Sequence, residues 1–99
     1  MSVLVRIVVP GDTEQFRAWV ASDADKLAEL GQQGRAAGCL HHRFAVGDGE
    51  ILIVDEWESA AAFESFFGSD EIAGAMQAGG AQGPPNVAIY EAVETADQF

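Results

Sequence analysis

An apolar strand that ends on a tryptophan and leads at once into a phenylalanine-rich helix is the feature that most constrains the fold. Trp57 closes the strand-like segment, and Ser59 stands where a helix N-cap side chain accepts from free backbone N–H groups. Phe63, Phe66 and Phe67 follow at helical spacing, so their rings lie on one side of the helix. The junction therefore predicts an aromatic wall beside a sheet, where a flat organic molecule can bind.

The segment before this junction has the pattern of a β-hairpin. Apolar residues alternate with others over residues 38–46 and 50–58, and the intervening Gly47-Asp48-Gly49 contains the Asp-Gly pair typical of a tight turn. Strict alternation divides the first strand into two faces. One face has Leu40, His42, Phe44 and Val46, and the other has Cys39, His41, Arg43 and Ala45.

The hairpin register brings two histidines opposite two acidic residues. Counting outward from a two-residue turn places His42 opposite Asp55. The same count places His41 opposite Glu56, on the other face of the sheet. The first pair is interpreted either as an ordinary cross-strand ion pair or as part of a functional site.

Two more strands and two helical regions complete the chain. Residues 3–9 and 87–93 alternate as strands do, and apolar residues between the first strand and the hairpin recur at helical spacing. This first helix is predicted to begin at Asp12 or Thr13 and to end at Gly31 and Gly34. The second region is predicted as two short helices, one broken at Gly68 and the next capped by Ser69 and stopped by Gly79-Gly80.

The resulting order of elements, β-α-β-β-α-β, indicates one α+β domain over residues 1–99 with a ferredoxin-like sandwich fold. Four antiparallel strands carry the helices on one face. The other face also reads as apolar, and no remaining segment of the chain can cover it. We therefore expect a homodimer in which two open sheet faces meet and close a dimeric α+β barrel.

Charge and composition exclude several classes of partner. The 99 residues carry a net charge of -11, which repels phosphate, so neither nucleic acid nor an anionic membrane is an expected partner. No apolar run approaches the roughly 20 residues that span a bilayer, and no targeting segment is visible, so a cytoplasmic protein is expected. Cys39 is the only cysteine and reads as a small core residue, and no metal-ligand cluster appears.

The strand–Trp–Ser–helix junction resembles the antibiotic-biosynthesis monooxygenase superfamily, whose members are dimeric α+β barrels. The matching positions are Trp57, Ser59, Ala62, Phe63, Phe66 and Ser69, together with Gly38-Cys39-Leu40 at the start of the second strand. The order of elements is similar over nearly the whole chain. The resemblance implies a small-molecule site beside Trp57.

The resemblance implies two functional branches, cofactor-free oxygenases of electron-rich phenols or quinols and haem-degrading monooxygenases. The haem enzymes have a histidine where this chain has Met76, and they use an asparagine that the first strand lacks. Imidazole is a strong iron ligand and a lone thioether is a poor one, so we interpret the sequence against haem degradation and expect no cofactor. Many cofactor-free members carry a histidine near the position of Phe66, which is also missing here.

Cofactor-free oxygenation needs an apolar cavity, a base and a group that stabilises an anion. His42 is the candidate base because imidazole exchanges protons near neutral pH. Arg6 or Arg43 is the candidate for holding the oxyanion. The residues expected to bind the substrate are Trp57, Phe63, Phe66, Met76 and Asp55.

Each candidate also has a structural interpretation. The phenylalanines can be core, Met76 can fill a gap, and Arg6 can pair with Glu91 within the sheet or across a dimer interface. Two hypotheses therefore stay open: a cofactor-independent monooxygenase of a small aromatic or quinol-type molecule, and a non-catalytic small-molecule-binding or accessory dimer. The Gly- and Pro-rich residues 79–85 are expected to form a mobile crossing or a lid.

Overall fold

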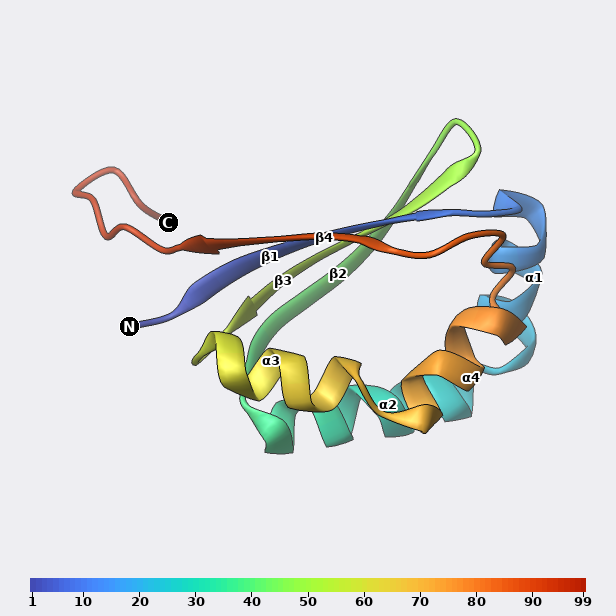
Figure 1. The fold of residues 1–99 in the computed structure, drawn as a ribbon, viewed down its shortest axis with the longest axis horizontal. Helices are drawn as coiled ribbons and strands as arrows, with labels where there is room; N and C mark the ends of the chain where they lie inside the picture. Colours follow the sequence, from blue (N-terminus) through green and yellow to red (C-terminus); the bar gives the residue numbers. More distant parts are fainter.

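One antiparallel sheet with every helix on the same face makes up the computed structural model, which describes residues 1–99 (Figure 1). The sheet order is β2-β3-β1-β4. The elements are β1 (Val3–Pro10), α1 (Thr13–Ser22), α2 (Ala24–Ala37), β2 (Cys39–Gly47), β3 (Glu50–Trp57), α3 (Ala60–Phe67), α4 (Asp70–Ala78) and β4 (Asn86–Glu91). This arrangement confirms the α+β ferredoxin-like fold.

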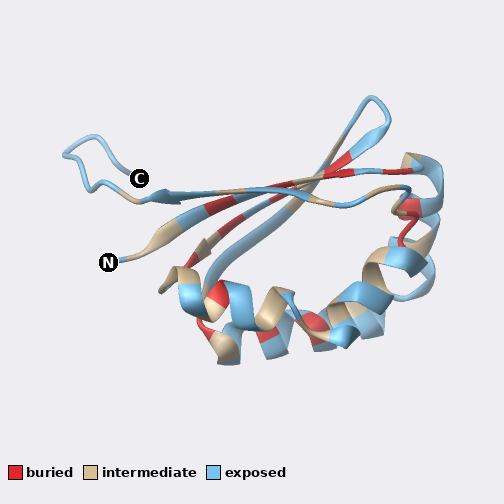
Figure 2. Ribbon diagram, viewed as in Figure 1, coloured by how far each residue is buried: buried red, intermediate tan, exposed pale blue.

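The core lies between the sheet and the helices and is thin. Alternate residues of the two central strands, β1 and β3, are buried because side chains along a strand point to opposite faces (Figure 2). Only 15 of the 99 residues are buried, so the monomer hides little of its surface. The buried apolar side chains are Val5, Ile7, Val9, Phe16, Leu30, Ile51, Ile53, Trp57 and Phe63.

The sheet face that points away from the helices is uncovered and partly apolar. Leu4, Val54 and Tyr90 on this face expose 45%, 48% and 52% of their surface. Arg6 also belongs to it, because its neighbours across the sheet are Val54 and Ala88. The expected pairing of Arg6 with Glu91 within the sheet is wrong, since Glu91 lies opposite Val3 on the face toward the helices.

The first helical region differs from the sequence prediction. It is two helices that meet at Asp23, and the second continues through Gly31 and Gly34 to Gly38. Gly38 alone among these glycines has a positive φ, +118°, and its N–H donates to the carbonyls of Arg35 and Gly34.

None of the helices is both long enough and apolar enough to cross a membrane.

The hairpin has the predicted turn and register, with one irregularity near its start. Gly47 pairs with Glu50, so Asp48 and Gly49 form the turn. A register shift between Cys39 and His41 leaves Leu40 outside the ladder. Cys39 therefore lies opposite Trp57 on the face toward the helices, and the predicted assignment of Cys39 and Leu40 to faces is wrong.

Both predicted serine caps are formed in the second helical region. Ser59 Oγ accepts from the Ala62 N–H at 3.1 Å, and Ser69 Oγ accepts from the Ile72 N–H at 3.3 Å. The last strand starts one residue earlier and ends two residues earlier than the alternation predicts, because pairing with β1 stops at the Val3–Glu91 position.

Replacing Gly38 with alanine is expected to lower the free energy of unfolding by more than about 1 kcal/mol, because its φ of +118° strains any residue with a Cβ. Gly74→Ala is the matched control in α4, where the new methyl group meets nothing within 4 Å. Better helix propensity should raise the stability of that variant by about 0.5–1 kcal/mol. Urea unfolding measures both changes, and a shift of the same sign in the two variants would contradict the assignment.

Candidate functional site

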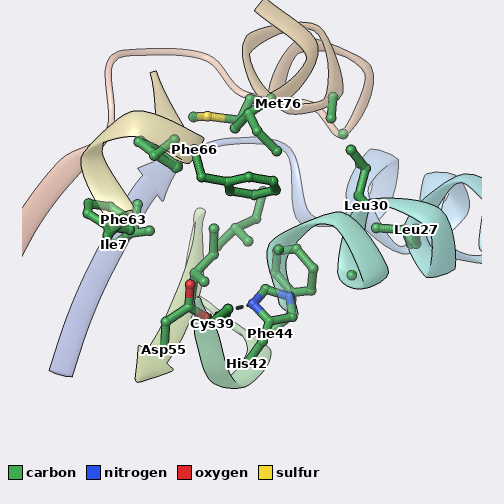
Figure 3. A pocket seen from close by; sticks show the side chains of 18 of the residues that line it. Ile7, Leu27, Leu30, Cys39, His42, Phe44, Asp55, Phe63, Phe66 and Met76 are labelled. Atoms are coloured by element: carbon green, nitrogen blue, oxygen red, sulfur yellow. Dashed lines mark hydrogen bonds and ion pairs between the residues drawn. The ribbon is translucent and has the colours of Figure 1, made fainter. Parts of the chain in front are cut away.

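A cavity of about 530 Å³ lies between the sheet and the helices (Figure 3). Its volume is in the range of small-molecule sites, about 300–1,000 Å³. Twenty of its 28 lining residues are hydrophobic, so the cavity favours an apolar ligand body. Strands β1, β2 and β3 and all four helices contribute to the lining.

An aromatic cluster forms the inner wall of the cavity. The Trp57 indole packs edge-on against Phe63, with ring centroids 5.7 Å apart, and tilted against Phe66 at 5.5 Å. Trp57 is only 2% exposed, whereas Phe66 and Met76 are half-buried. Trp57 therefore supports the wall from behind, and Phe66 and Met76 offer more surface to a ligand.

One buried carboxylate interrupts the apolar wall. Asp55 is 6% exposed and is the only charged residue in the buried set. Its Oδ1 lies 2.7 Å from His42 Nδ1, and its Oδ2 accepts from Trp57 Nε1 at 3.0 Å. Burying a carboxylate is costly unless donors satisfy it, and these two donors come from β2 and from β3 itself.

The hydrogen bond to Asp55 decides which nitrogen of His42 is free. A carboxylate only accepts, so Nδ1 carries a proton, and in the neutral ring the lone pair is on Nε2. Nε2 has no hydrogen-bond partner within the chain. The His42 side chain is 43% exposed and packs edge-on against Phe44, with ring centroids 4.8 Å apart. His42 is thus an oriented imidazole at the border between cavity and solvent, a geometry suited to proton transfer.

The structure brings together six of the eight candidate site residues. Those that line the cavity are His42, Asp55, Trp57, Phe63, Phe66 and Met76. Arg6 does not join them, because it lies on the uncovered face of the sheet. Arg43 lies on that face too, opposite Val54.

Sequence reasoning missed Arg35 and Cys39 as cavity residues. Arg35 is in the last turn of α2, beyond Gly34, where the sequence predicted that the helix had already ended. Cys39 faces the cavity because of the bulge at Leu40. A sequence signal for Arg35 existed: Gly38, the glycine next to the strand, is where the helix ends. Ending the predicted helix there would have placed Arg35 in its last turn.

The Cys39 thiol is not activated. Burial raises its pKa to about 11, and the nearby Asp55 carboxylate acts in the same direction. Its Sγ donates to the His41 carbonyl oxygen at 3.3 Å. Cys39 is therefore a neutral wall residue near neutral pH.

Comparison with known proteins places this chain in a family. Residues 8–78 match the sequence model described as "Antibiotic biosynthesis monooxygenase". The chain belongs to that family. The match spans both helical regions and the hairpin, and it confirms the resemblance carried by Trp57, Ser59 and the phenylalanines. No curated protein matches the chain significantly.

Several solved structures share the fold of this chain. Rv0793 from Mycobacterium tuberculosis has a TM-score of 0.65 and 20% identity, covering 98% of this chain and 100% of its own. The ActVA-Orf6 monooxygenase of Streptomyces coelicolor, solved with the ligand Nanaomycin D, has a TM-score of 0.67 and 17% identity, covering 99% and 93%. NE2512 from Nitrosomonas europaea has a TM-score of 0.65 and 18% identity, covering 99% and 95%. At these identities the likeness establishes the fold.

Within the monooxygenase family fold, Met76 lies on α4 in the cavity wall. Met76 therefore presents a thioether to the cavity, and a lone thioether is a weak iron ligand. No group of three or more His, Cys, Asp or Glu side chains is arranged to hold a metal ion.

The raised pKa of Cys39 predicts slow reaction with a neutral disulfide reagent such as 4,4′-dithiodipyridine. The pKa is about 11 in place of 9.0, so at about pH 8 the thiolate is about 100-fold scarcer than in the unfolded chain. Its higher intrinsic nucleophilicity recovers part of this, leaving a rate about tenfold lower. The folded protein's rate should still rise with pH beyond pH 9.0, where the unfolded chain levels off. A plateau below that pH would contradict the assignment.

Proposed function

We propose that the protein is a cofactor-independent monooxygenase acting on a small aromatic or quinol-type molecule held between the sheet and the helices. One observation carries the proposal: Asp55, in an otherwise apolar wall, accepts hydrogen bonds from both His42 Nδ1 and Trp57 Nε1. The family assignment and the cavity support it.

The Asp55–His42 pair supplies the base that the reaction needs. Asp55 fixes the imidazole tautomer and its orientation, and it stabilises the imidazolium formed when Nε2 takes a proton. The indole N–H on the second carboxylate oxygen fixes the carboxylate in turn. A ligand hydroxyl or acidic C–H at the cavity border then meets an oriented base in an apolar setting.

The proposed reaction balances with dioxygen as the only co-substrate. His42 removes a proton from an activated ring CH₂, and the resulting anion transfers one electron to O₂. The ring radical and superoxide combine into a peroxide anion, which recovers the proton from His42. Loss of water then leaves a ring carbonyl. One oxygen atom ends in the product and the other in water, and the substrate supplies all the electrons.

The aromatic wall fits a substrate of this kind. Phe66 and Met76 offer polarisable, half-buried surface to a flat ring, and Trp57 and Phe63 keep that surface in place. The ActVA-Orf6 monooxygenase, which shares the fold, was solved with the ligand Nanaomycin D. That complex supports a ligand-binding role for this architecture.

We also propose that two copies associate through the uncovered sheet face. Leu4, Val54 and Tyr90 supply its exposed apolar surface. In a chain of net charge -11, the strand row through Val54 contains Arg6 and Arg43 and no acidic side chain. The two cations offset part of the chain's negative charge at the centre of this face, which lowers the repulsion between two copies there, and Arg6 then has an interface role.

The second candidate function is a binding or accessory dimer that uses the same cavity without turnover. The absence of a histidine near Phe66, where the resemblance implies that many cofactor-free oxygenases carry one, favours this function. The two functions separate cleanly by experiment, since only the first consumes oxygen.

Asp55→Asn is expected to lower oxygen uptake with anthrone at least about 100-fold, the usual contribution of a general base. An Asn side chain can accept from Trp57 and donate to His42 Nδ1, which moves the ring proton to Nε2 and blocks the base. His42→Gln should show a similar loss. Arg17→Gln, an exposed residue of α1 that does not line the cavity, is the control and should keep wild-type kcat.

An oxygen electrode gives the rates, and circular dichroism verifies the fold of each variant. Equal rates in wild type, Asp55→Asn and His42→Gln would remove the proposed role of the pair. Wild-type rates at the uncatalysed background, with a bound aromatic ligand, would favour the binding dimer.

Val54→Lys is expected to convert the dimer into a monomer, because it places a third cation between Arg6 and Arg43 on an apolar interface. Val20→Lys is the control, since Val20 is exposed on helix α1, remote from this face. Sedimentation velocity at micromolar concentration measures the association state. A wild-type monomer, or an unaltered dimer in Val54→Lys, would contradict the proposed interface.

A further inference from the structure

We propose that Arg35 binds an acidic group of the ligand at the cavity mouth, so that the preferred ligand is an aromatic acid. The inference rests on the proposed ligand-binding function of the cavity and assigns a specificity residue to it. The observation behind it is that Arg35, one of few cations in a strongly acidic chain, lines the cavity.

Arg35 is the only lysine or arginine among the residues that line the cavity. The chain has five such cations against 16 acidic residues. Lys26 on α2 is paired with Glu71 on α4 at 3.0 Å. Arg35, in contrast, makes no ion pair and no side-chain hydrogen bond within the chain. Its guanidinium is therefore available to an anion from outside.

The cavity changes in polarity from its inner wall to its mouth. Trp57 and Phe63 are buried, whereas Arg35 and His42 are exposed. Arg35 stands in the last turn of α2, and His42 stands on β2, the edge strand that starts two residues after this helix ends. A ligand that fits this gradient has an apolar ring system at one end and an anionic group at the other.

The acidic side chain of the cavity wall does not oppose this assignment. Both oxygens of Asp55 already accept hydrogen bonds, one from His42 and one from Trp57. Glu56 is no counter-charge in the cavity either, because it lies with His41 on the uncovered face of the sheet, 3.8 Å from His41 Nε2. The Asp55 carboxylate is thus buried and hydrogen-bonded, whereas the Arg35 guanidinium has no partner in the chain and can donate to an outside anion.

A favourable interaction with the negative end of helix α2 explains why a cation suits position 35. It does not require the side chain to border the cavity, so it predicts an effect on stability alone. The ligand role predicts an effect that depends on ligand charge. The two explanations therefore differ in a measurable way.

Two fluorescent probes with the same rings provide the test. Anilinonaphthalene sulfonate carries one negative charge, and N-phenylnaphthylamine is its uncharged analogue. Arg35→Gln is expected to raise the Kd of the sulfonate about fivefold or more, as for a charge-assisted contact that is partly screened by solvent. The Kd of the neutral probe should stay the same, and Arg35→Lys should retain most of the affinity for the sulfonate.

Two controls locate the binding. Arg17→Gln removes an exposed cation on α1 that does not line the cavity, and it should change neither Kd. Gly31 lines the cavity, and a Cβ there meets nothing within 4 Å, so Gly31→Leu should fill the space and weaken both probes. Added sodium chloride should weaken sulfonate binding in wild type more than in Arg35→Gln.

Unchanged sulfonate affinity in Arg35→Gln would overturn the inference while leaving the cavity function intact. Equal weakening of both probes, together with a lower melting temperature, would assign Arg35 a structural role and also overturn it. Failure of both probes to bind wild type would refute the ligand-binding function itself, and the inference with it.

Discussion

A carboxylate in an apolar wall must find donors, and the way Asp55 finds them organises the rest of the molecule. One donor, His42, comes from the edge strand β2, and the other, Trp57, comes two residues later on β3. The first bond ties the edge of the sheet to its centre and orients the imidazole. The second fixes the indole against which Phe63 and Phe66 pack. The aromatic wall and the oriented base are thus both held by hydrogen bonds to the same buried carboxylate.

The core and the cavity are built from the same side chains. At the sequence level, core and pocket are competing interpretations of Phe63, Phe66 and Met76, but here the rings and the thioether serve both. The cavity beside the thin core leaves apolar surface accessible on the helix side of the sheet. The uncovered face leaves further apolar surface accessible on the opposite side. Binding events on either side therefore add stability to the folded state by mass action.

The periodicity of the sequence was sufficient to predict most of the fold and, in the site, the pairing of His42 with Asp55. Period-two alternation and the Asp48-Gly49 turn were sufficient to place His42 opposite Asp55. The end of α2 was mispredicted because Gly31 and Gly34 are tolerated inside the helix, and tertiary packing, not propensity, decides where such a helix stops. The bond from Trp57 to Asp55 and the orientation of Arg35 toward the cavity depend on rotamers and on distant elements, which periodicity does not encode.

The bulge at Leu40 has a consequence for how such a site can diversify. Because of this bulge, the alternation of side chains between the two faces of the sheet shifts by one residue at Leu40. His42 comes after the bulge, on the side of the hairpin turn. Loss or gain of one residue at this point exchanges the thiol wall at Cys39 for another side chain without rotating the base out of alignment. A change of one residue in the length of β2 at Leu40 can therefore alter the shape of the cavity wall while the position of the His42 base stays the same.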